Sequence, residues 1–359
     1  MSIRPAAAMV VALSVLSLAA CASTGTPVGS PNGTTAADPT ESKTLTVVTH
    51  ESFDLSDEAK ARFAKESGYE VSYIAPGDAG TVVNQLILTK DSPLGDVVYG
   101  IDNTFAQRAI DEGVLGKYDS AALPAAVKAE YPLGDSGVLT PVDYGQVCVN
   151  ADNAWFAERQ LAIPATLDDL LKPEYKGTLV VENPASSSPG LSFLFATVGA
   201  KGANGYLAYW EALKANGVKV VSGWTEAYTV EFSGSSGKGK YPLVVSYNTS
   251  PADEIGEDGQ AWTSALTQTC FQQTEYAGVI NGAQNEVGAQ KFIEFLLSVE
   301  VQSEIPDKMW MYPVHPGADI PEAWATYAPQ ADKPLEIPAA DMAANREAWI
   351  KAWTEKVIG

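Results

Sequence analysis

The sequence has few of the side chains that carry metal-dependent or hydrolytic chemistry. Its 359 residues include two histidines and three cysteines. It contains no CxxC pair, no HExxH motif and no EF-hand loop. A zinc site or a Ser-His-Asp triad needs several such residues at suitable spacing, so these kinds of site are disfavoured. The sequence therefore predicts neither a metal centre nor a cofactor.

Basic residues are also scarce. Lys and Arg together number 23 against 44 Asp and Glu, which gives a formal net charge of -21 at pH 7. Binding to nucleic acid needs clusters of Lys and Arg that face the phosphate backbone, so nucleic acid is excluded as a partner. The excess of negative charge is compatible with a cationic ligand.

Long apolar runs are absent beyond the N-terminus. Residues 1–21 combine the positive charge of Arg4, a short apolar stretch and the motif Leu-Ala-Ala-Cys, which ends at Cys21. This pattern is typical of an export signal, and its apolar stretch is shorter than the roughly 20 residues of a spanning helix. The motif resembles a bacterial lipobox, which implies cleavage before Cys21 and a lipid on its thiol. We expect the mature protein to be lipid-anchored through Cys21 on the extracytoplasmic face of the bacterial cell membrane.

The rest of the chain divides into a tether and a folded region. Residues 22–44 are rich in Ser, Thr, Gly, Pro and Ala and nearly lack large apolar side chains, so we expect a flexible tether. The residues that follow are enough for one large or two medium domains. We expect 45–145 to form the first part of lobe 1 and 146–277 to form lobe 2. Residues 278–359 are expected to return to lobe 1 and to end in C-terminal helices.

Short β-rich runs alternate with helix-like stretches through this region. The predicted strands are 45–49, 70–75, 96–99, 178–182, 218–221 and 242–247. The predicted helices are 81–89, 105–112, 191–198 and 206–216, with two more amphipathic helices around Phe63 and Phe295. Repeated strand–helix units are typical of an α/β fold with mainly parallel sheets, and two α/β lobes fit the pattern better than one.

Two further strands are candidates for crossing between the lobes. They are 146–150 and 275–280, and each lies next to one of the two remaining cysteines, Cys148 and Cys270. In an exported protein, two cysteines favour a disulfide, which would here staple the hinge between the lobes. The alternative is a free nucleophilic thiol at Cys148.

Three aromatic residues lie in segments marked by Gly, Ser and Pro rather than in regular apolar runs. They are Trp224, Tyr247 and Trp310. Binding groups concentrate in loops that a rigid scaffold holds, so these rings predict a recognition surface. The alternative is that the rings fill the core beneath the loops.

Two predicted strand-to-helix turns are further candidates for ligand contact. Residues 186–190 place serine hydroxyls at a helix N-terminus, which favours anions or polar oxygens, although capping by Ser188 is the simpler alternative. Residues 76–80 place Asp78 either as a helix cap or as a carboxylate that faces a cationic or amino-bearing ligand. Ligands of open α/β sheets gather beyond the carboxyl ends of strands, where both turns are expected.

These segments recur in the order and spacing of a known family. They include Asp-Ala-Gly at 78–80, Ser-Ser-Pro-Gly-Leu at 187–191, Gly-Trp-Thr-Glu-Ala-Tyr at 223–228, Ser-Tyr-Asn-Thr-Ser-Pro at 246–251 and Trp-Met-Tyr-Pro-Val at 310–314. From about Leu45 to the last helix, the chain resembles the thiamine-binding proteins of bacterial thiamine ABC importers. The resemblance implies a two-lobed periplasmic-binding-protein fold of type II, with a ligand cleft between the lobes.

The resemblance also implies a function and a set of ligand contacts. The function is capture of thiamine or one of its phosphates and delivery to an ABC permease, by a monomer that is not an enzyme. Asp78 and Ala79 would face the ligand from the first lobe, and Ser187 and Ser188 would bind its hydroxyethyl or phosphate end. The rings and polar groups around the heterocycles would come from Trp224, Tyr247, Asn248, Thr249, Ser250, Pro251 and Trp310.

Several positions depart from the family pattern. His50 and Asp253 stand where better-studied members carry tyrosines, so they are the remaining candidates for ligand contact. Ala79 and Ala185 stand where glycine and arginine are usual. Thiamine has a permanent thiazolium charge and a flat aminopyrimidine, and each aromatic face can offer it roughly 0.5–2 kcal/mol of stacking or cation–π attraction.

Two other functions stay open on sequence grounds. The same fold could hold another small solute, such as a polyamine or ferric ion, although adjacent tyrosine ligands for iron are not seen near the second crossing strand. The enzymatic alternative is a thiamine-cleaving transferase with Cys148 as its nucleophile. A disulfide to Cys270 would remove that thiol.

Overall fold

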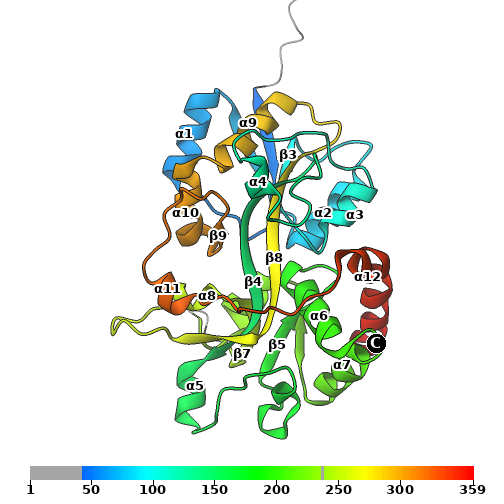
Figure 1. The fold of residues 1–359 in the computed structure, drawn as a ribbon, viewed down its shortest axis with the longest axis vertical. Coiled ribbons are helices and arrows are strands. Elements are labelled where there is room, and N and C mark those ends of the chain that lie inside the picture. Colours follow the sequence, from blue (N-terminus) through cyan, green and yellow to red (C-terminus); the bar gives the residue numbers. More distant parts are fainter. Residues whose placement is uncertain (1–42, 236–237) are drawn as a thin grey trace, which may run out of the picture. The chain divides into compact units, whose positions relative to one another are not determined.

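A computed structural model describes residues 43–235 and 238–359 of the chain (Figure 1). The export signal predicted at 1–21, the lipidation site at Cys21 and all but the last two residues of the predicted tether lie outside these described residues. Within them, no helix has the length and apolar character needed to cross a membrane.

The described chain alternates between strands and helices throughout. Its first half contains β1 (Thr44–Val48), α1 (Asp57–Ser67), β2 (Glu70–Ile74), α2 (Ala79–Leu88), β3 (Val97–Asp102), α3 (Ala106–Asp111), α4 (Ala125–Lys128), β4 (Thr140–Asp152), α5 (Asn153–Glu158) and β5 (Leu179–Glu182). Its second half contains α6 (Ser188–Lys201), α7 (Tyr206–Ala215), β6 (Lys219–Val221), β7 (Leu243–Tyr247), α8 (Ser250–Asp253), β8 (Thr263–Val279), α9 (Glu286–Leu296), α10 (Val299–Met309), β9 (Tyr312–Pro313), α11 (Trp324–Tyr327) and α12 (Ala339–Trp353).

The nine strands found in the described residues form one mixed sheet. Its order is β2-β1-β3-β8-β4-β7-β5-β6, and β9 pairs with β4. On one side of the sheet, β1 pairs in parallel with β2 and β3, and we call this group with its helices lobe 1. On the other side, β5 pairs in parallel with β6 and β7, and we call this group with its helices lobe 2. The sequence predicts mainly parallel sheets, whereas the centre of the sheet is antiparallel. The reason is that β8 and β4 run opposite to each other and to the strands beside them.

The strands β4 and β8 run through both lobes (Figure 1). They are the longest strands described, with 13 and 17 residues, and their pairing extends from Thr140 opposite Ala277 to Asp152 opposite Thr263. The two predicted crossing segments are parts of these strands. The register shifts between Val147 and Val149, so this point of the ladder is irregular.

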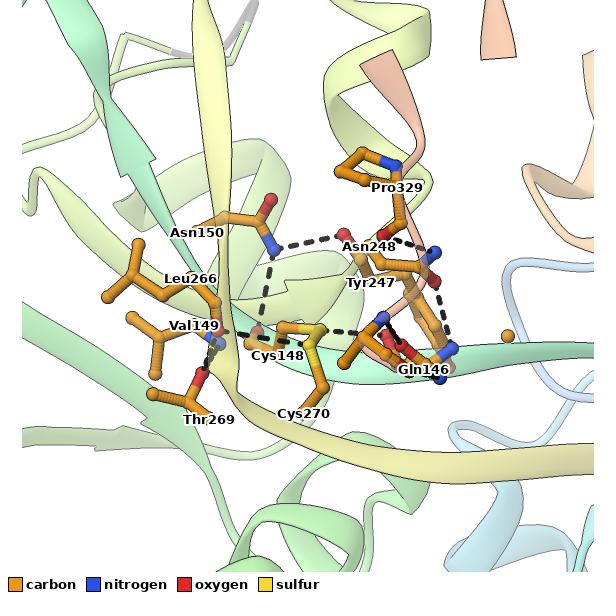
Figure 2. The surroundings of a disulfide bond; sticks show 12 residues. Gln146, Cys148, Val149, Asn150, Tyr247, Asn248, Leu266, Thr269, Cys270 and Pro329 are labelled. Atoms are coloured by element: carbon orange, nitrogen blue, oxygen red, sulfur yellow. Dashed lines mark hydrogen bonds between the residues drawn. A yellow bond between two sulfur atoms is a disulfide. The ribbon is translucent and has the colours of Figure 1, made fainter. Parts of the chain in front are cut away.

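Cys148 and Cys270 lie at this irregularity, and the structure joins them by a disulfide (Figure 2). Their Cα atoms are 4.2 Å apart, and both side chains are fully buried. A side chain replaces a backbone acceptor at this irregularity, because the backbone amide of Val149 donates to the Thr269 hydroxyl at 2.9 Å. A nucleophilic role for Cys148 is incompatible with this bonded state.

Apolar cores lie on both lobes and extend to the C-terminus. In lobe 1, Phe63 of α1 meets Phe292 of α9 edge-on, with ring centroids 5.2 Å apart. In lobe 2, Trp210 of α7 meets Trp353 of α12 at 5.3 Å. The chain therefore returns to lobe 1 through α9, whereas its last long helix, red in Figure 1, packs beside α6 and α7 of lobe 2. Arg346 links this helix back to lobe 1 by donating to the Thr104 carbonyl at 3.1 Å.

The disulfide should contribute measurably to stability, because it closes a loop between residues 122 positions apart. We expect replacement of both cysteines by alanine to lower the free energy of unfolding by about 2–4 kcal/mol while the native fold is kept. Urea unfolding of the oxidised wild type and of the double variant measures the difference. Equal midpoints, or two free thiols in the exported wild type, would contradict this expectation.

Candidate functional site

A cavity of about 260 Å³ lies between the two lobes. Its wall comes from four parts of the chain: the segment after β1, the N-terminal end of α2, lobe 2 with β8, and the C-terminal end of α10. The lining residues are His50, Glu51, Ser52, Asp78, Trp224, Thr225, Thr229, Tyr247, Glu275, Lys308, Met309, Trp310 and Met311. Concave sites with apolar walls and a few convergent polar groups are typical of small-molecule binding.

One wall of the cavity is aromatic. Trp224 stacks on Tyr228 with centroids 5.0 Å apart and planes inclined by 12°. Trp310 approaches Trp224 edge-on at 5.8 Å, and Tyr247 lies 6.4 Å from Trp224. The indole nitrogen of Trp224 donates to the Ser246 hydroxyl at 2.9 Å. The ring is therefore fixed both by stacking on Tyr228 and by a hydrogen bond at its edge. These rings form a fixed surface for a flat ligand.

The position of Trp310 depends on an unusual backbone conformation. It ends α10 with φ 55° and ψ 34°, the left-handed region. For a residue other than glycine this conformation costs roughly 1–2 kcal/mol. Its effect is to end the helix at Met309 and to place the indole against Trp224 and Tyr228 of lobe 2. Backbone strain of this kind is concentrated at functional sites.

Asp78 connects the two lobes at the edge of the cavity. Its Oδ1 accepts from the amide of Ala79 at 2.7 Å and caps α2, while its Oδ2 accepts from the amide of Trp224 at 3.1 Å. Gly223 permits this approach, because a Cβ there would lie 3.2 Å from the same Oδ2. A second contact between the lobes joins the Ser52 and Thr225 hydroxyls at 3.1 Å. Asp78 is therefore both a helix cap and a cavity carboxylate.

A buried polar network lies behind the cavity. The Tyr99 hydroxyl is 2.9 Å from Oε2 of Glu275 and also bonds the carboxyl of Asp143. Because a hydroxyl has one proton, one of these carboxyls must supply the other. Burial and the neighbouring Glu275 raise the pKa of Asp143 well above its usual value, so Asp143 is the protonated partner.

Glu275 is the ionised member of this network. Burial alone would raise its pKa, but His50, Tyr99 and Gln273 outweigh burial and hold the pKa below its usual value. Its Oε2 lies 3.4 Å from Nε2 of His50, and its Oε1 accepts from the Gln273 amide at 3.1 Å. The same amide nitrogen lies 3.1 Å from the Tyr247 hydroxyl. Glu275 thus places a fixed negative charge at the cavity wall.

The structure brings five of the thirteen ligand-contact residues predicted from the sequence together in the cavity. They are His50, Asp78, Trp224, Tyr247 and Trp310. The other eight are not among the lining residues: Ala79, Ser187, Ser188, Asn248, Thr249, Ser250, Pro251 and Asp253. All of these except Asp253 are buried.

Several of the buried residues instead support the site. The Asn248 side chain accepts from the amide of Gln146 at 2.9 Å and donates to the carbonyl of Pro329 at 3.1 Å. The Ser250 hydroxyl accepts from the amide of Tyr247 at 3.3 Å. Together they fix the turn that carries Tyr247. The cap of α6 is Ser187, whose hydroxyl accepts from the Gly190 amide, and not Ser188, which is the first residue of the helix.

Asp253 is exposed and lies near Asp307 and Trp310. Partial burial and the Asp307 carboxylate raise the pKa of Asp253 to about 6, while a hydrogen bond with Trp310 acts in the opposite direction. Asp253 is therefore adjacent to the aromatic wall without lining the cavity.

Eight lining residues were not predicted from the sequence: Glu51, Ser52, Thr225, Thr229, Glu275, Lys308, Met309 and Met311. Most are neighbours in sequence of predicted residues, so proximity to a recognised segment was a usable signal. Glu275 had no such signal, because its approach to His50 depends on the pairing of β8 with β3.

Comparison with known proteins identifies the family. Residues 92–351 match the family described as bacterial extracellular solute-binding protein. The chain belongs to this family. One relative is the thiamine-binding periplasmic protein of Salmonella typhimurium, 31% identical over 87% of this chain and 93% of the relative. The Escherichia coli protein of the same name is 30% identical, over 87% of this chain and 93% of the relative.

Solved structures agree with this assignment. A periplasmic thiamin binding protein superposes with a TM-score of 0.75 and 28% identity, over 88% of this chain and 96% of the other. The ferric binding protein from Campylobacter jejuni superposes with a TM-score of 0.66 at 16% identity, over 87% of this chain and 99% of the other, so it shares the fold alone. The predicted two-lobed periplasmic-binding-protein fold is thus confirmed.

The family also settles the class of function. This extracellular solute-binding protein serves ABC import and is not an enzyme, as the sequence predicted. The transferase hypothesis is therefore wrong, and the bonded state of Cys148 agrees with that conclusion. Among the described residues, no group of three or more His, Cys, Asp and Glu side chains could hold a metal ion.

The double role of Asp78 predicts a graded response to substitution. We expect Asp78→Ala to lower the free energy of unfolding by about 1–2 kcal/mol, because it removes the α2 cap and the bond to Trp224. Asp78→Asn keeps an oxygen acceptor for the Ala79 amide and should lose less. Denaturant unfolding of the two variants tests this order, and an unchanged Asp78→Ala protein would refute it.

Proposed function

We propose that this protein captures thiamine outside the cell and delivers it to the permease of an ABC importer. The observation that carries the proposal is the composition of the cavity, in which three aromatic rings meet three carboxylates. The proposal is supported by relatives at 31% and 30% identity that are named thiamine-binding periplasmic proteins.

The cavity chemistry suits the two ends of thiamine. Trp224, Tyr247 and Trp310 offer faces and edges to its flat rings, and such contacts contribute roughly 0.5–2 kcal/mol each. Carboxylates can offset the thiazolium charge and accept from the amino group of the pyrimidine. The hydroxyls of Thr225 and Thr229 can bond the hydroxyethyl end. Several such contacts in a closed cleft suffice for nanomolar affinity, which corresponds to about −12 kcal/mol.

The charge of the cavity favours thiamine over its phosphates. Among the described residues that line it, Lys308 is the one fixed cation against Glu51, Asp78 and Glu275. A phosphate group needs several donors or cations in its immediate surroundings. The serines predicted to bind a phosphate end, Ser187 and Ser188, are buried outside this wall. We therefore propose thiamine itself as the principal ligand.

A calorimetric titration of the purified mature protein with thiamine tests this function. We expect saturable binding at micromolar ligand or below, and weaker binding of thiamine diphosphate. Trp224→Ala should weaken thiamine binding more than about tenfold, because a stacking and cation–π surface is lost. Trp262→Ala is the matched control, since Trp262 is 52% exposed and outside the cavity wall. Absence of a response to thiamine would refute the proposed ligand.

We propose in addition that the protein is held at the membrane by a lipid on Cys21. The support is the export signal with its Leu-Ala-Ala-Cys motif. We expect Cys21→Ser to leave the folded domain intact and to abolish lipid labelling, because Cys21 is the one residue proposed to carry the lipid. Fractionation of cells fed a labelled fatty acid measures this, and continued labelling of the variant would contradict the anchor.

A further inference from the structure

His50 is the histidine that lies in the cavity wall, and a hydrogen bond to its Nδ1 defines its protonation state. Its Nδ1 accepts from the backbone amide of Ser52 at 3.2 Å, and its Nε2 lies 3.4 Å from Oε2 of Glu275. A ring nitrogen that accepts a hydrogen bond has no proton. In this arrangement the imidazole is neutral, with its proton on Nε2, the nitrogen nearer to Glu275.

The imidazole of His50 packs against the backbone of β3 at Gly100. Gly100 has φ 91°, and the register between β3 and β8 shifts at this residue, between Tyr99 and Ile101. A Cβ at Gly100 would overlap Cδ2 of His50. The imidazole therefore lies directly against bare backbone, and it has little freedom to turn away from Glu275. His50 is 8% exposed, so a positive charge on its ring would be screened only weakly by bulk water.

Charged groups face His50 from every element packed around it. Carboxylates approach from Glu275 of β8, from Asp78 at the start of α2 and from the adjacent Glu51. The Tyr99 ring of β3 lies 5.5 Å from the imidazole, and its hydroxyl bonds the protonated Asp143 of β4. Lys308 of α10 lines the same cavity. Protonation of His50 would thus add a second cation to a wall that otherwise has an excess of negative charge.

The carboxylates around His50 and the hydrogen bond from Ser52 favour opposite states of the ring. Burial lowers the pKa of His50, but the carboxylates of Glu275, Asp78 and Glu51 outweigh burial and raise the pKa above 6.5. The bond from the Ser52 amide requires the neutral ring. A bound cation would favour the neutral ring, because the cation itself then neutralises the carboxylates.

We propose that His50 is the charge-selecting residue of the cavity, where its neutral form leaves Glu275 to attract a cationic ligand and its protonated form opposes that ligand. This inference rests on the proposed function, since thiamine is the cation concerned. The structure shows the neutral form, in which Nδ1 accepts from the Ser52 amide. In the protonated form Nδ1 carries a proton and this bond is lost. Thiamine selects the neutral form, so its binding releases the Nδ1 proton of the protonated fraction to solvent. Binding and deprotonation of one residue are thereby coupled.

The direction of the pH dependence follows from this coupling. A ligand that binds the neutral form binds weakly where free His50 is protonated, and its affinity rises as pH increases through the pKa of the free protein. The carboxylates raise the pKa of His50, so the rise in affinity should be centred at a higher pH than the titration of an exposed histidine. Two like charges a few ångströms apart in a partly buried site correspond to roughly a tenfold change in affinity or more.

The decisive experiment is calorimetric titration of the mature wild-type protein with thiamine between about pH 6 and about pH 8.5. We expect affinity to rise roughly tenfold over this range. Titrations near neutral pH in two buffers with different ionisation enthalpies should show net release of protons on binding. Affinity that is flat with pH, or the absence of proton release, would overturn the role of His50.

Two variants assign the effect to the residue. His50→Gln should remove the pH dependence and the proton release, whatever its affinity. His315→Gln is the matched control, because His315 is the other histidine of the chain and lies outside the cavity wall, and it should keep both. A pH dependence that survives in His50→Gln would refute the inference. No binding of thiamine to the wild type at any pH would instead refute the proposed function itself.

Discussion

The pairing of β4 with β8 is the constraint on which the rest of the structure depends. These two strands join lobe 1 to lobe 2 within one sheet, and the disulfide between Cys148 and Cys270 locks them where their ladder is irregular. β8 also carries Glu275 and Gln273 to the cavity wall. On the opposite strand, Gln146 holds Asn248, which fixes the turn with Tyr247. The same pair of strands therefore connects the lobes and positions the polar part of the site.

The polar network behind the cavity breaks the usual preference for an apolar interior. Asp143 and Glu275 are both buried, and burial of charge is costly unless each group is hydrogen-bonded or neutralised. Here one carboxyl is protonated and the other is ionised beside His50. Trp310 adds a left-handed backbone to the same region. Departures from local rules that gather in one place are typical of a functional site.

The two central strands were predicted too short, as 146–150 and 275–280 against Thr140–Asp152 and Thr263–Val279, because their length depends on pairing between distant segments. The short strands of the two lobes could be predicted to within a few residues, because they depend on local periodicity and on Gly, Pro and Asp residues at their ends. The turn after β2 was recognised in this way, and so was its cap Asp78. The Ser187 cap was misplaced by one residue, since two adjacent serines offer the same hydroxyl to the helix. Local patterns cannot distinguish such neighbours.

The cavity wall was only partly predictable. The loop aromatics Trp224, Tyr247 and Trp310 could be found because rings beside turn residues are conspicuous in a sequence. The burial of Asn248 and Ser250 was not foreseeable, because polar residues in a turn give the same signal whether they face a ligand or hold the turn. The contact of His50 with Glu275 joins residues far apart in the chain, and it exists only through the pairing of β3 with β8.

The central claim is that the cavity between the lobes is a thiamine site built from aromatic rings and carboxylates. A crystal structure of the mature protein grown with thiamine tests it most directly. We predict that the two rings of the ligand lie against Trp224, Tyr247 and Trp310, with the thiazolium within reach of Glu275 or Asp78. An empty cavity at saturating thiamine, or thiamine bound elsewhere on the protein, would contradict the claim.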